Sequence, residues 1–370
     1  MKSIIRQPVK RQARRNVMKQ SIAILGAGLV GRMLALYFEK QSSLSLEVHL
    51  YEKSTLNDAN STGRIAAAMV APTSESTKAS PEIVEWGKQS LVLWPEILST
   101  LNLSHLFHKT GSIVTAHPLD EPELMQFVTL VSDKDGLSPS LHLSDLQAIE
   151  PELGDSFQRG YFLKEEAHID NDQLYIETEN QIKSSRIRLY EGTPLNIDSI
   201  TNEFDCVIDC RGLGAKYELD KESKRLRGVR GEIIKVHAPE VSLTHPVRIM
   251  HPRQSIYIVP KPHHHFTIGA TEIESEDKRK PTMRSVLELL SAAYQVNTGF
   301  AEAEIVECRS GLRPTLLDNK PIVEKSRQHS NVIMVNGLYR HGYLLLPVLY
   351  HKAIALVEYV LCRQLLPESQ

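Results

Sequence analysis

One glycine-rich segment constrains the fold of this chain more than any other feature. It carries the pattern GxGxxG, whose glycines are Gly26, Gly28 and Gly31. The pattern follows the short apolar run 21–25, which is typical of a buried strand. Apolar residues then recur at three- and four-residue steps over 30–38, as in an amphipathic helix, and 46–51 alternates as a second strand. The order strand, helix, strand predicts one βαβ unit.

The spacing within this unit is the one that binds a dinucleotide. The first glycine permits a tight turn, the second lets the backbone approach a pyrophosphate, and the third lets helix and strand pack closely. The phosphates would bind the free N–H groups at the helix N-terminus. Glu52 ends the second strand about twenty residues after Gly31, where a carboxylate accepts hydrogen bonds from the adenosine ribose. The segment therefore predicts a Rossmann-type site for FAD or NAD.

The rest of the chain is long enough for a second domain. At 370 residues it exceeds the usual size of one hydrophobic core. The ranges 229–237, 248–260 and 265–271 alternate as antiparallel strands, and 285–294 has helical periodicity. A later apolar strand, 204–209, returns to the nucleotide domain. We expect an α/β fold, in which a Rossmann-type FAD-binding domain joins a substrate domain built on a large mixed or antiparallel sheet.

We predict that the FAD-binding domain is discontinuous. It comprises 18–80, 145–225 and 305–366, and the substrate domain comprises 81–144 and 226–304. Residues 1–17 are basic, contain no acidic residue and no apolar stretch, and are expected to form a solvated tail, with Met18 opening the folded part. Such a composition also fits a transit peptide. The apolar stretch 344–361 is interrupted by proline and charged residues, so we interpret it as a buried core helix and not as a membrane span.

The overall composition excludes several classes of partner. The net charge is −2, so the balance of charge gives no reason to expect nucleic acid or an anionic membrane as a partner. The four cysteines are too scattered for a disulfide framework, which fits a reducing, cytoplasmic compartment. Three consecutive histidines, 263–265, cannot all converge on one ion, and we predict a solvated turn there and no metal site.

A second segment, 61–72, is unusually rich in small residues. A run of alanine and glycine lets backbone N–H groups approach a flat ring, although the start of a buried helix would have a similar composition. The segment resembles the second flavin-contacting motif of the D-amino-acid oxidase superfamily, and in particular the glycine oxidases of thiamine biosynthesis. Four further segments agree with that family in order: 209–215, 257–260 with 269–271, 311–314 with 318–319, and 337–345. The resemblance covers the chain from Ile22 to about Leu361.

The resemblance assigns three residues to the substrate. Arg313 lies between Gly311 and Pro314, in what we predict to be a constrained turn, and its guanidinium fork can hold a carboxylate by two parallel hydrogen bonds. In the family the matching arginine binds the substrate carboxylate. Tyr257 matches a tyrosine that joins this contact, and Arg340 matches a second arginine near substrate and flavin. A structural ion pair for either arginine, and sheet packing for the tyrosine, stay open as alternatives.

The same resemblance assigns the residues that hold the cofactor. They are Gly26, Gly28, Gly31, Glu52, Thr62, Ala67, Ala68, Met69, Gly212, Gly342, Tyr343 and Leu344. The last three precede or open the apolar helix 344–361, so their amides would form its free N-terminus. A helix N-terminus stabilises the negative charge that a reduced flavin carries. The Tyr343 side chain also fits simple core packing.

One position, Glu272, departs from the glycine oxidases, and one cysteine bears on how the flavin is attached. Glu272 follows the segment 269–271, where some glycine oxidases have an apolar residue lining the pocket. If its side chain points inward it meets the substrate, and if it points to solvent it has no role. Cys308 lies near the region where sarcosine oxidases attach their flavin but precedes the 311–314 segment, so we expect non-covalent FAD and no metal.

The predicted function is oxidation of the amine of a small amino acid to an imino acid, with dioxygen reduced to hydrogen peroxide. The candidate substrates are glycine, sarcosine and small D-amino acids, and the resemblance links the product to thiamine thiazole assembly. An amino-acid dehydrogenase that passes electrons to a quinone or a protein is the first alternative. A flavin oxidase that modifies tRNA is the second, and it would require a basic surface that 18–370 does not display. The oligomeric state stays open, and a homo-oligomer fits as well as a monomer.

Overall fold

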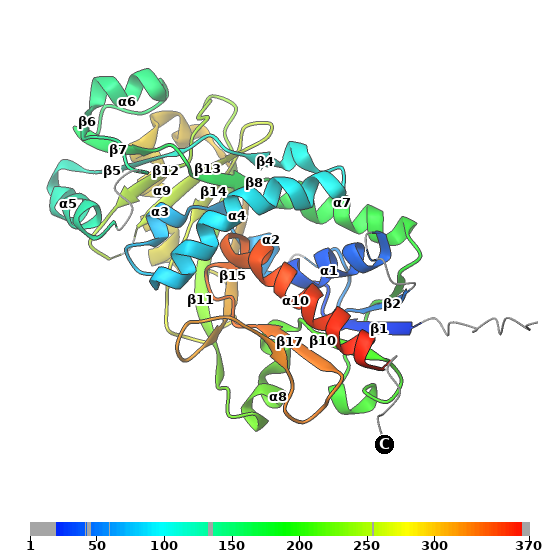
Figure 1. Cartoon of the computed structure of the whole chain (residues 1–370). Coiled ribbons are helices and arrows are strands. Elements are labelled where there is room, and N and C mark those ends of the chain that lie inside the picture. The colour runs from blue at the N-terminus through cyan, green and yellow to red at the C-terminus, as the bar shows by residue number, and fades with distance from the viewer. Residues whose placement is uncertain are drawn as a thin grey trace, which may run out of the picture.

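The computed structural model describes residues 20–40, 42, 46–58, 60–131, 136–253 and 255–364. The predicted basic tail, 1–17, and the predicted start of the folded part at Met18 lie outside these residues. Figure 1 shows two sheets side by side, and the long strands β11 and β15 form the edge of the larger sheet that lies nearer the smaller one.

The smaller sheet is the nucleotide-binding sheet that the glycine pattern predicts. Its strand order is β16-β17-β10-β1-β2-β9, and every pair is parallel except β16 with β17. The bounds are β1 Gln20–Leu25, β2 Leu46–Tyr51, β9 Arg188–Tyr190, β10 Cys206–Asp209, β16 Ile322–Lys325 and β17 Val332–Asn336. Residues 22–25 of β1 and 206–208 of β10 are apolar and buried, as expected for central strands of a sheet that is covered on both faces.

The larger sheet has eight strands in the order β15-β11-β14-β13-β12-β5-β7-β6. All its pairs are antiparallel except β12 with β5, so the sheet is mixed. The bounds are β5 Ser112–Ala116, β6 Leu141–His142, β7 Arg159–Leu163, β11 Leu226–His237, β12 Val247–Met250, β13 Ile256–Lys261, β14 His265–Gly269 and β15 Glu304–Leu316. The predicted range 248–260 is two strands, since Pro252 lies between them and cannot donate a ladder hydrogen bond.

The helices and a small third sheet complete the fold. The α-helices are α1 Leu29–Lys40, α2 Thr62–Ile65, α3 Pro72–Glu75, α4 Pro81–Thr100, α5 Glu121–Leu130, α6 Leu143–Ile149, α7 Asn171–Ser184, α8 Lys216–Lys221, α9 Met283–Val296 and α10 Gly342–Gln364. Short 3₁₀ turns lie at Ser104–Leu106, Pro118–Asp120, Ile197–Ser199, Gly212–Ala215 and Thr298–Glu302. The third sheet pairs β3 Met69–Val70 and β4 Phe107–His108 with β8 Ala167–Ile169.

Strand pairing divides the chain differently from the predicted domain boundaries at two places. The predicted FAD-binding segments 145–225 and 305–366 include β7 and β15, and both strands pair in the larger sheet. The boundary at residue 305 is hard to place from sequence, because β15 pairs with β11 of the larger sheet along its whole length. The division into two domains otherwise stays a prediction.

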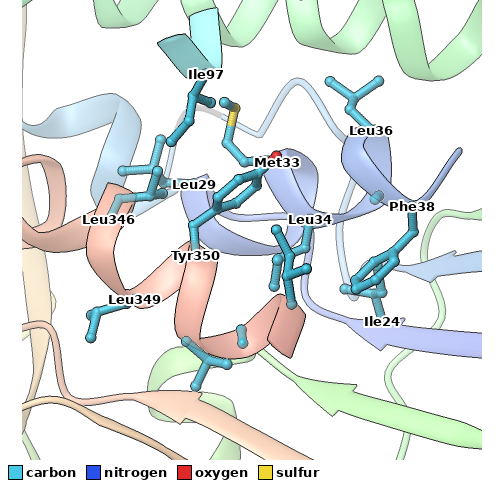
Figure 2. Close-up of a cluster of buried hydrophobic side chains, with 14 of the residues drawn as sticks. Ile24, Leu29, Met33, Leu34, Leu36, Phe38, Ile97, Leu346, Leu349 and Tyr350 are labelled. Carbon is cyan, nitrogen blue, oxygen red and sulfur yellow. The ribbon is translucent and has the colours of Figure 1, made fainter. Parts of the chain in front are cut away.

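Helix α10 is a core helix of the nucleotide-binding part. Figure 2 shows Leu346, Leu349 and Tyr350 of α10 packed near Met33 and Leu34 of α1, with Ile97 of α4 beside them. The stretch Gly342–Cys362 is long and apolar enough to cross a membrane by composition alone, but 67% of its most apolar window is buried in the fold. Because α1 and α4 cover its apolar surface, we assign it to the core, as the sequence predicts.

Candidate active site

A cavity of about 660 Å³ lies where the two sheets meet. Every candidate cofactor and substrate residue from the sequence lines it except Gly31. Gly31 lies in the first turn of α1, where a Cβ atom would come within 1.9 Å of the Gly26 carbonyl oxygen. Its role is therefore close packing of helix on strand, as the third glycine of the pattern predicts.

The glycine loop and Glu52 form one end of the cavity. Gly26 has φ +89°, and a Cβ atom there would lie 2.8 Å from the Cys210 carbonyl oxygen. At Gly28, by contrast, a Cβ atom would meet nothing closer than 4.0 Å, so the backbone is open to a ligand. Glu52 Oε2 accepts a hydrogen bond of 2.7 Å from the Ala27 amide, and Oε1 accepts one of 3.1 Å from Ser54. These bonds fix the carboxylate beside the loop.

The first turn of α10 and the small-residue segment form the middle of the cavity. Leu345 is the first residue of α10 whose amide reaches a carbonyl one turn back, that of His341, at 2.8 Å. The amides of Gly342, Tyr343 and Leu344 are therefore the unpaired N–H groups of the helix start, and all three residues line the cavity. The Tyr343 hydroxyl donates to the Gly63 carbonyl at 2.9 Å, so its side chain also anchors the segment.

Arg313 lies in β15 and not in a turn, which corrects the prediction made from its neighbours Gly311 and Pro314. Pro314 is tolerated because β15 is an edge strand, where one side of the backbone needs no partner. The guanidinium lies over Gly231 of β11, where a Cβ atom would be 2.3 Å from Nη2. It donates only to two carbonyl oxygens, those of Arg230 at 3.3 Å and Thr271 at 3.1 Å. No carboxylate among the described residues pairs with it.

Arg340 has the opposite surroundings, because two carboxylates neutralise it. Its Nε and Nη2 donate to Glu75 Oε2 at 2.9 and 2.7 Å, and its Nη1 donates to Glu272 Oε2 at 2.9 Å. Glu272 also accepts a hydrogen bond from the Tyr339 hydroxyl. The Glu272 carboxylate is thus turned toward the cavity and not away from it.

Burial and charge act in opposite directions on the groups around Glu75. Burial alone would raise the pKa of Glu75, but the charges of Arg340, His341 and Arg248 outweigh it and hold that pKa at about 2. Burial lowers the pKa of His341 to about 4, although Glu75 lies 3.4 Å from its Nδ1. Burial also raises the pKa of Tyr257, which lines the same cavity, despite the nearby Arg313. At neutral pH the site therefore holds an ionised Glu75 and neutral His341 and Tyr257.

Comparison with known proteins shows the family. The model of the FAD dependent oxidoreductase family matches residues 21–349. A Rhizobium etli protein named as a thiamine biosynthesis oxidoreductase, ThiO, is 36% identical over 328 residues, covering 89% of this chain and 93% of the relative. The glycine oxidase of Geobacillus kaustophilus is 25% identical over 362 residues, covering 89% and 90%.

The chain belongs to the FAD dependent oxidoreductase family. A crystal structure of the Geobacillus kaustophilus glycine oxidase has the same fold, with a TM-score of 0.76 over 92% of this chain and 95% of that one. The predicted family and fold class are confirmed. The individual roles of the site residues stay predictions.

The cavity fits FAD by its own geometry. The glycine loop, Glu52 and the α10 start offer an open backbone, a fixed carboxylate and unpaired amides along one cavity. Cys308 is not among the residues that line this cavity, and non-covalent binding of FAD stays a prediction. Among the described residues, no cluster of His, Cys, Asp or Glu has an arrangement that could hold a metal ion.

Two charged residues of the site, Glu75 and Arg248, are not among those that the sequence patterns predict. Arg248 Nη2 lies 3.8 Å from Glu75 Oε1, so both belong to the network around Arg340. Glu75 is the first charged residue after the small-residue segment 61–72, and this position is a signal that could have identified it. Arg248 gives no such signal, because an alternating strand carries charged residues on its solvent face as well.

Proposed function

We propose that this FAD-dependent oxidoreductase oxidises the amine of a small amino acid to the imino acid and reduces dioxygen to hydrogen peroxide. Glycine is the leading substrate, with sarcosine and small D-amino acids as the other candidates. The relatives named as ThiO and as glycine oxidases support this proposal. The relative named for thiamine biosynthesis also supports a role in that pathway. We propose that the imino acid serves thiazole assembly in the cytoplasm.

The observation that carries the proposal is the free guanidinium of Arg313. A buried or half-buried arginine usually pairs with a carboxylate. Among the residues that the structure describes, Arg313 instead donates hydrogen bonds only to backbone carbonyl oxygens, and it lines the cavity that the proposed cofactor residues also line. A planar fork in this position suits the two oxygens of an amino-acid carboxylate. Tyr257 would add a hydroxyl donor, since burial keeps that hydroxyl protonated.

The remaining charges of the site limit what else can bind beside Arg313. Glu75 and Glu272 occupy the donors of Arg340, so a second anionic group of a substrate would meet two carboxylates there. Such juxtaposition of like charges is unfavourable. We therefore expect amino acids with one carboxylate to be preferred over dicarboxylic ones.

Positioning is the main contribution of these side chains to the reaction. FAD, when bound, would accept the hydride of the Cα–H bond, while the amine lone pair forms the C=N bond and the amine loses a proton. Arg313 and Tyr257 would hold the carboxylate and thereby fix the distance of Cα from the cofactor. The amine has to be neutral for its lone pair to assist, and we assign no general base to the protein.

A peroxide assay tests the proposal directly. Purified protein is supplied with glycine, sarcosine, D-alanine and D-aspartate in air, and peroxide is measured with and without an added quinone acceptor. We expect peroxide from glycine and little from D-aspartate. Turnover of an amino acid only with the quinone would replace the oxidase by a dehydrogenase, and no turnover of any amino acid with either acceptor would overturn the proposal.

A further inference from the structure

The small-residue segment of the cavity is held by its carbonyl groups. Asn171, the first residue of α7, is buried, and its Nδ2 donates to the carbonyl oxygens of Arg64 at 2.9 Å and Ala66 at 2.8 Å. Its third contact is with the Gly63 carbonyl at 3.3 Å. Three carbonyl oxygens on one side fix which end of the side-chain amide faces them.

A second buried side chain holds the next peptide group. Lys261 lies at the end of β13, and its Nζ donates to the carbonyl oxygens of Ala67 at 3.0 Å and Ile169 at 2.6 Å. Burial lowers the pKa of Lys261 to about 8, against the attraction of Asp170 and Asp172, so the ammonium is still charged at pH 7. The Ala68 carbonyl accepts from the Ile169 amide at 3.0 Å.

Because the peptide bond is planar, these contacts also set the direction of the N–H groups on the opposite side of the segment. In a trans peptide the carbonyl and the following N–H point in opposite directions. The bond from Asn171 to the Ala66 carbonyl therefore directs the Ala67 amide away from α7, and the bond from Lys261 directs the Ala68 amide away from β13. Neither amide donates to an acceptor within the described ranges, and both residues line the cavity.

Unpartnered amides of this kind need an acceptor. A buried N–H without a partner costs free energy comparable to a lost hydrogen bond. Ala67 and Ala68 are both almost fully buried, and Ala68 has the unusual φ of +61°. Such a backbone conformation persists where its surroundings hold it in place.

We propose that Lys261 and Asn171 are positioning residues that orient two successive peptide groups so that the Ala67 and Ala68 amides face the acceptor atoms of the flavin ring. The inference rests on the proposed placement of FAD in this cavity and is independent of the proposed substrate. Lys261 does not touch the cofactor in this arrangement. It acts through the Ala67 carbonyl.

Lys261→Met tests the proposal, because methionine keeps most of the buried stem and removes the donors. Apoprotein is titrated with FAD at pH 7, below the unfolding temperature of each apoprotein, and the visible spectrum of bound FAD is recorded at saturation. Loss of a hydrogen bond from a charged donor predicts a Kd for FAD raised by about 10- to 100-fold. The flavin absorption bands should shift as well, since the amides that face the ring are no longer fixed. Asn171→Leu should raise Kd and shift the bands in the same directions.

Lys235→Met is the matched control. Lys235 is another largely buried lysine near the segment, but its Nζ pairs with Asp172 at 2.7 Å and approaches only the Arg64 carbonyl, at 3.4 Å. The Kd of Lys235→Met for FAD should stay within about twofold of wild type, and the absorption bands of its bound FAD should not shift. An unchanged Kd and spectrum in both Lys261→Met and Asn171→Leu would overturn the proposal, and so would equal changes in Lys235→Met.

A third variant, Gly28→Ala, distinguishes a wrong placement of FAD from a wrong role of the two positioning residues. Gly28→Ala puts a methyl group on the open side of the glycine loop. If that variant binds FAD as tightly as wild type, the cofactor does not lie along the loop and the placement is wrong. If Gly28→Ala loses FAD while Lys261→Met and Asn171→Leu do not, only the role of the two positioning residues is overturned.

Discussion

The two walls of the cavity are built on different principles. The cofactor wall consists of backbone and small residues: the glycine loop, the segment 66–69 and the start of α10. The proposed substrate wall consists of charged side chains, among them Arg313 of β15, Arg340 of the loop before α10 and Glu75 of α3. The first wall presents N–H groups whose direction is set by the fold, and the second presents charges that neutralise one another except at Arg313.

This difference predicts which substitutions affect which property. A change in the cofactor wall should alter FAD affinity or the fold, since its small residues would leave space for the cofactor beside their N–H groups. A change in the substrate wall should alter turnover at constant FAD content.

The largest effect is expected at Arg313. Arg313→Ala should keep FAD but lower kcat/KM for glycine by about 30- to 4000-fold, as expected when one partner of a partly desolvated charge pair is removed. Arg313→Lys should recover little, because an ammonium lacks the planar fork. Steady-state kinetics with glycine measure the loss. Arg309→Ala, on the same strand but paired with Glu307, is the control and should stay near wild type.

In the cofactor wall, Gly31→Ala and Gly28→Ala should fail in different ways. The Gly31 methyl group would come within 1.9 Å of the Gly26 carbonyl oxygen, so we expect the apoprotein to lose about 1–3 kcal/mol of stability or more. The Gly28 methyl group meets no protein atom closer than 4.0 Å, so Gly28→Ala should lose FAD affinity without a loss of apoprotein stability. Urea unfolding and FAD titration separate the two, and equal stability losses would contradict the assignment.

The pH dependence of stability tests the charged network. Burial lowers the folded-state pKa of His341 to about 4, below its ordinary value of 6.5. Its contribution to stability is therefore complete above pH 6.5 and is lost as the pH falls toward 4. At pH 5 this linkage amounts to about 2 kcal/mol. Denaturant unfolding of the apoprotein gives the free energy of unfolding at pH 8 and at pH 5. This free energy should fall less between the two pH values in His341→Asn than in wild type, by about 2 kcal/mol. An equal fall in both proteins would contradict burial of His341 as the cause.

Glu272 should give the smallest effect. Its side chain is one-third exposed, and exposed ion pairs contribute up to about 1 kcal/mol. Glu272→Leu should therefore change kcat/KM for glycine by no more than about fivefold. It should also improve turnover of D-alanine relative to glycine, because an apolar side chain replaces a carboxylate in the cavity. A loss as large as that of Arg313→Ala would place Glu272 in direct contact with the substrate.

The two walls also differ in how far the sequence predicts them. The cofactor wall is encoded in short contiguous patterns, and the structure places Gly26, Glu52 and Ala67 in one cavity as those patterns suggest. The substrate wall depends on strand pairing. Arg313 was expected in a turn and lies in β15, and its surroundings depend on Gly231, more than eighty residues away along the chain. Glu75 and Arg248 become neighbours only when α3 and β12 meet, which no local pattern specifies.

Anaerobic mixing is the most direct test of carboxylate recognition by Arg313, since it removes the question of the electron acceptor. Wild-type protein carrying FAD is mixed without oxygen with glycine or with ethylamine, and the visible flavin absorbance is followed. We expect rapid bleaching by glycine, slow or no bleaching by ethylamine, and loss of this preference in Arg313→Ala. Equal bleaching by the two amines in the wild type, or an undiminished preference for glycine in Arg313→Ala, would contradict the claim that Arg313 selects amino acids by their carboxylate.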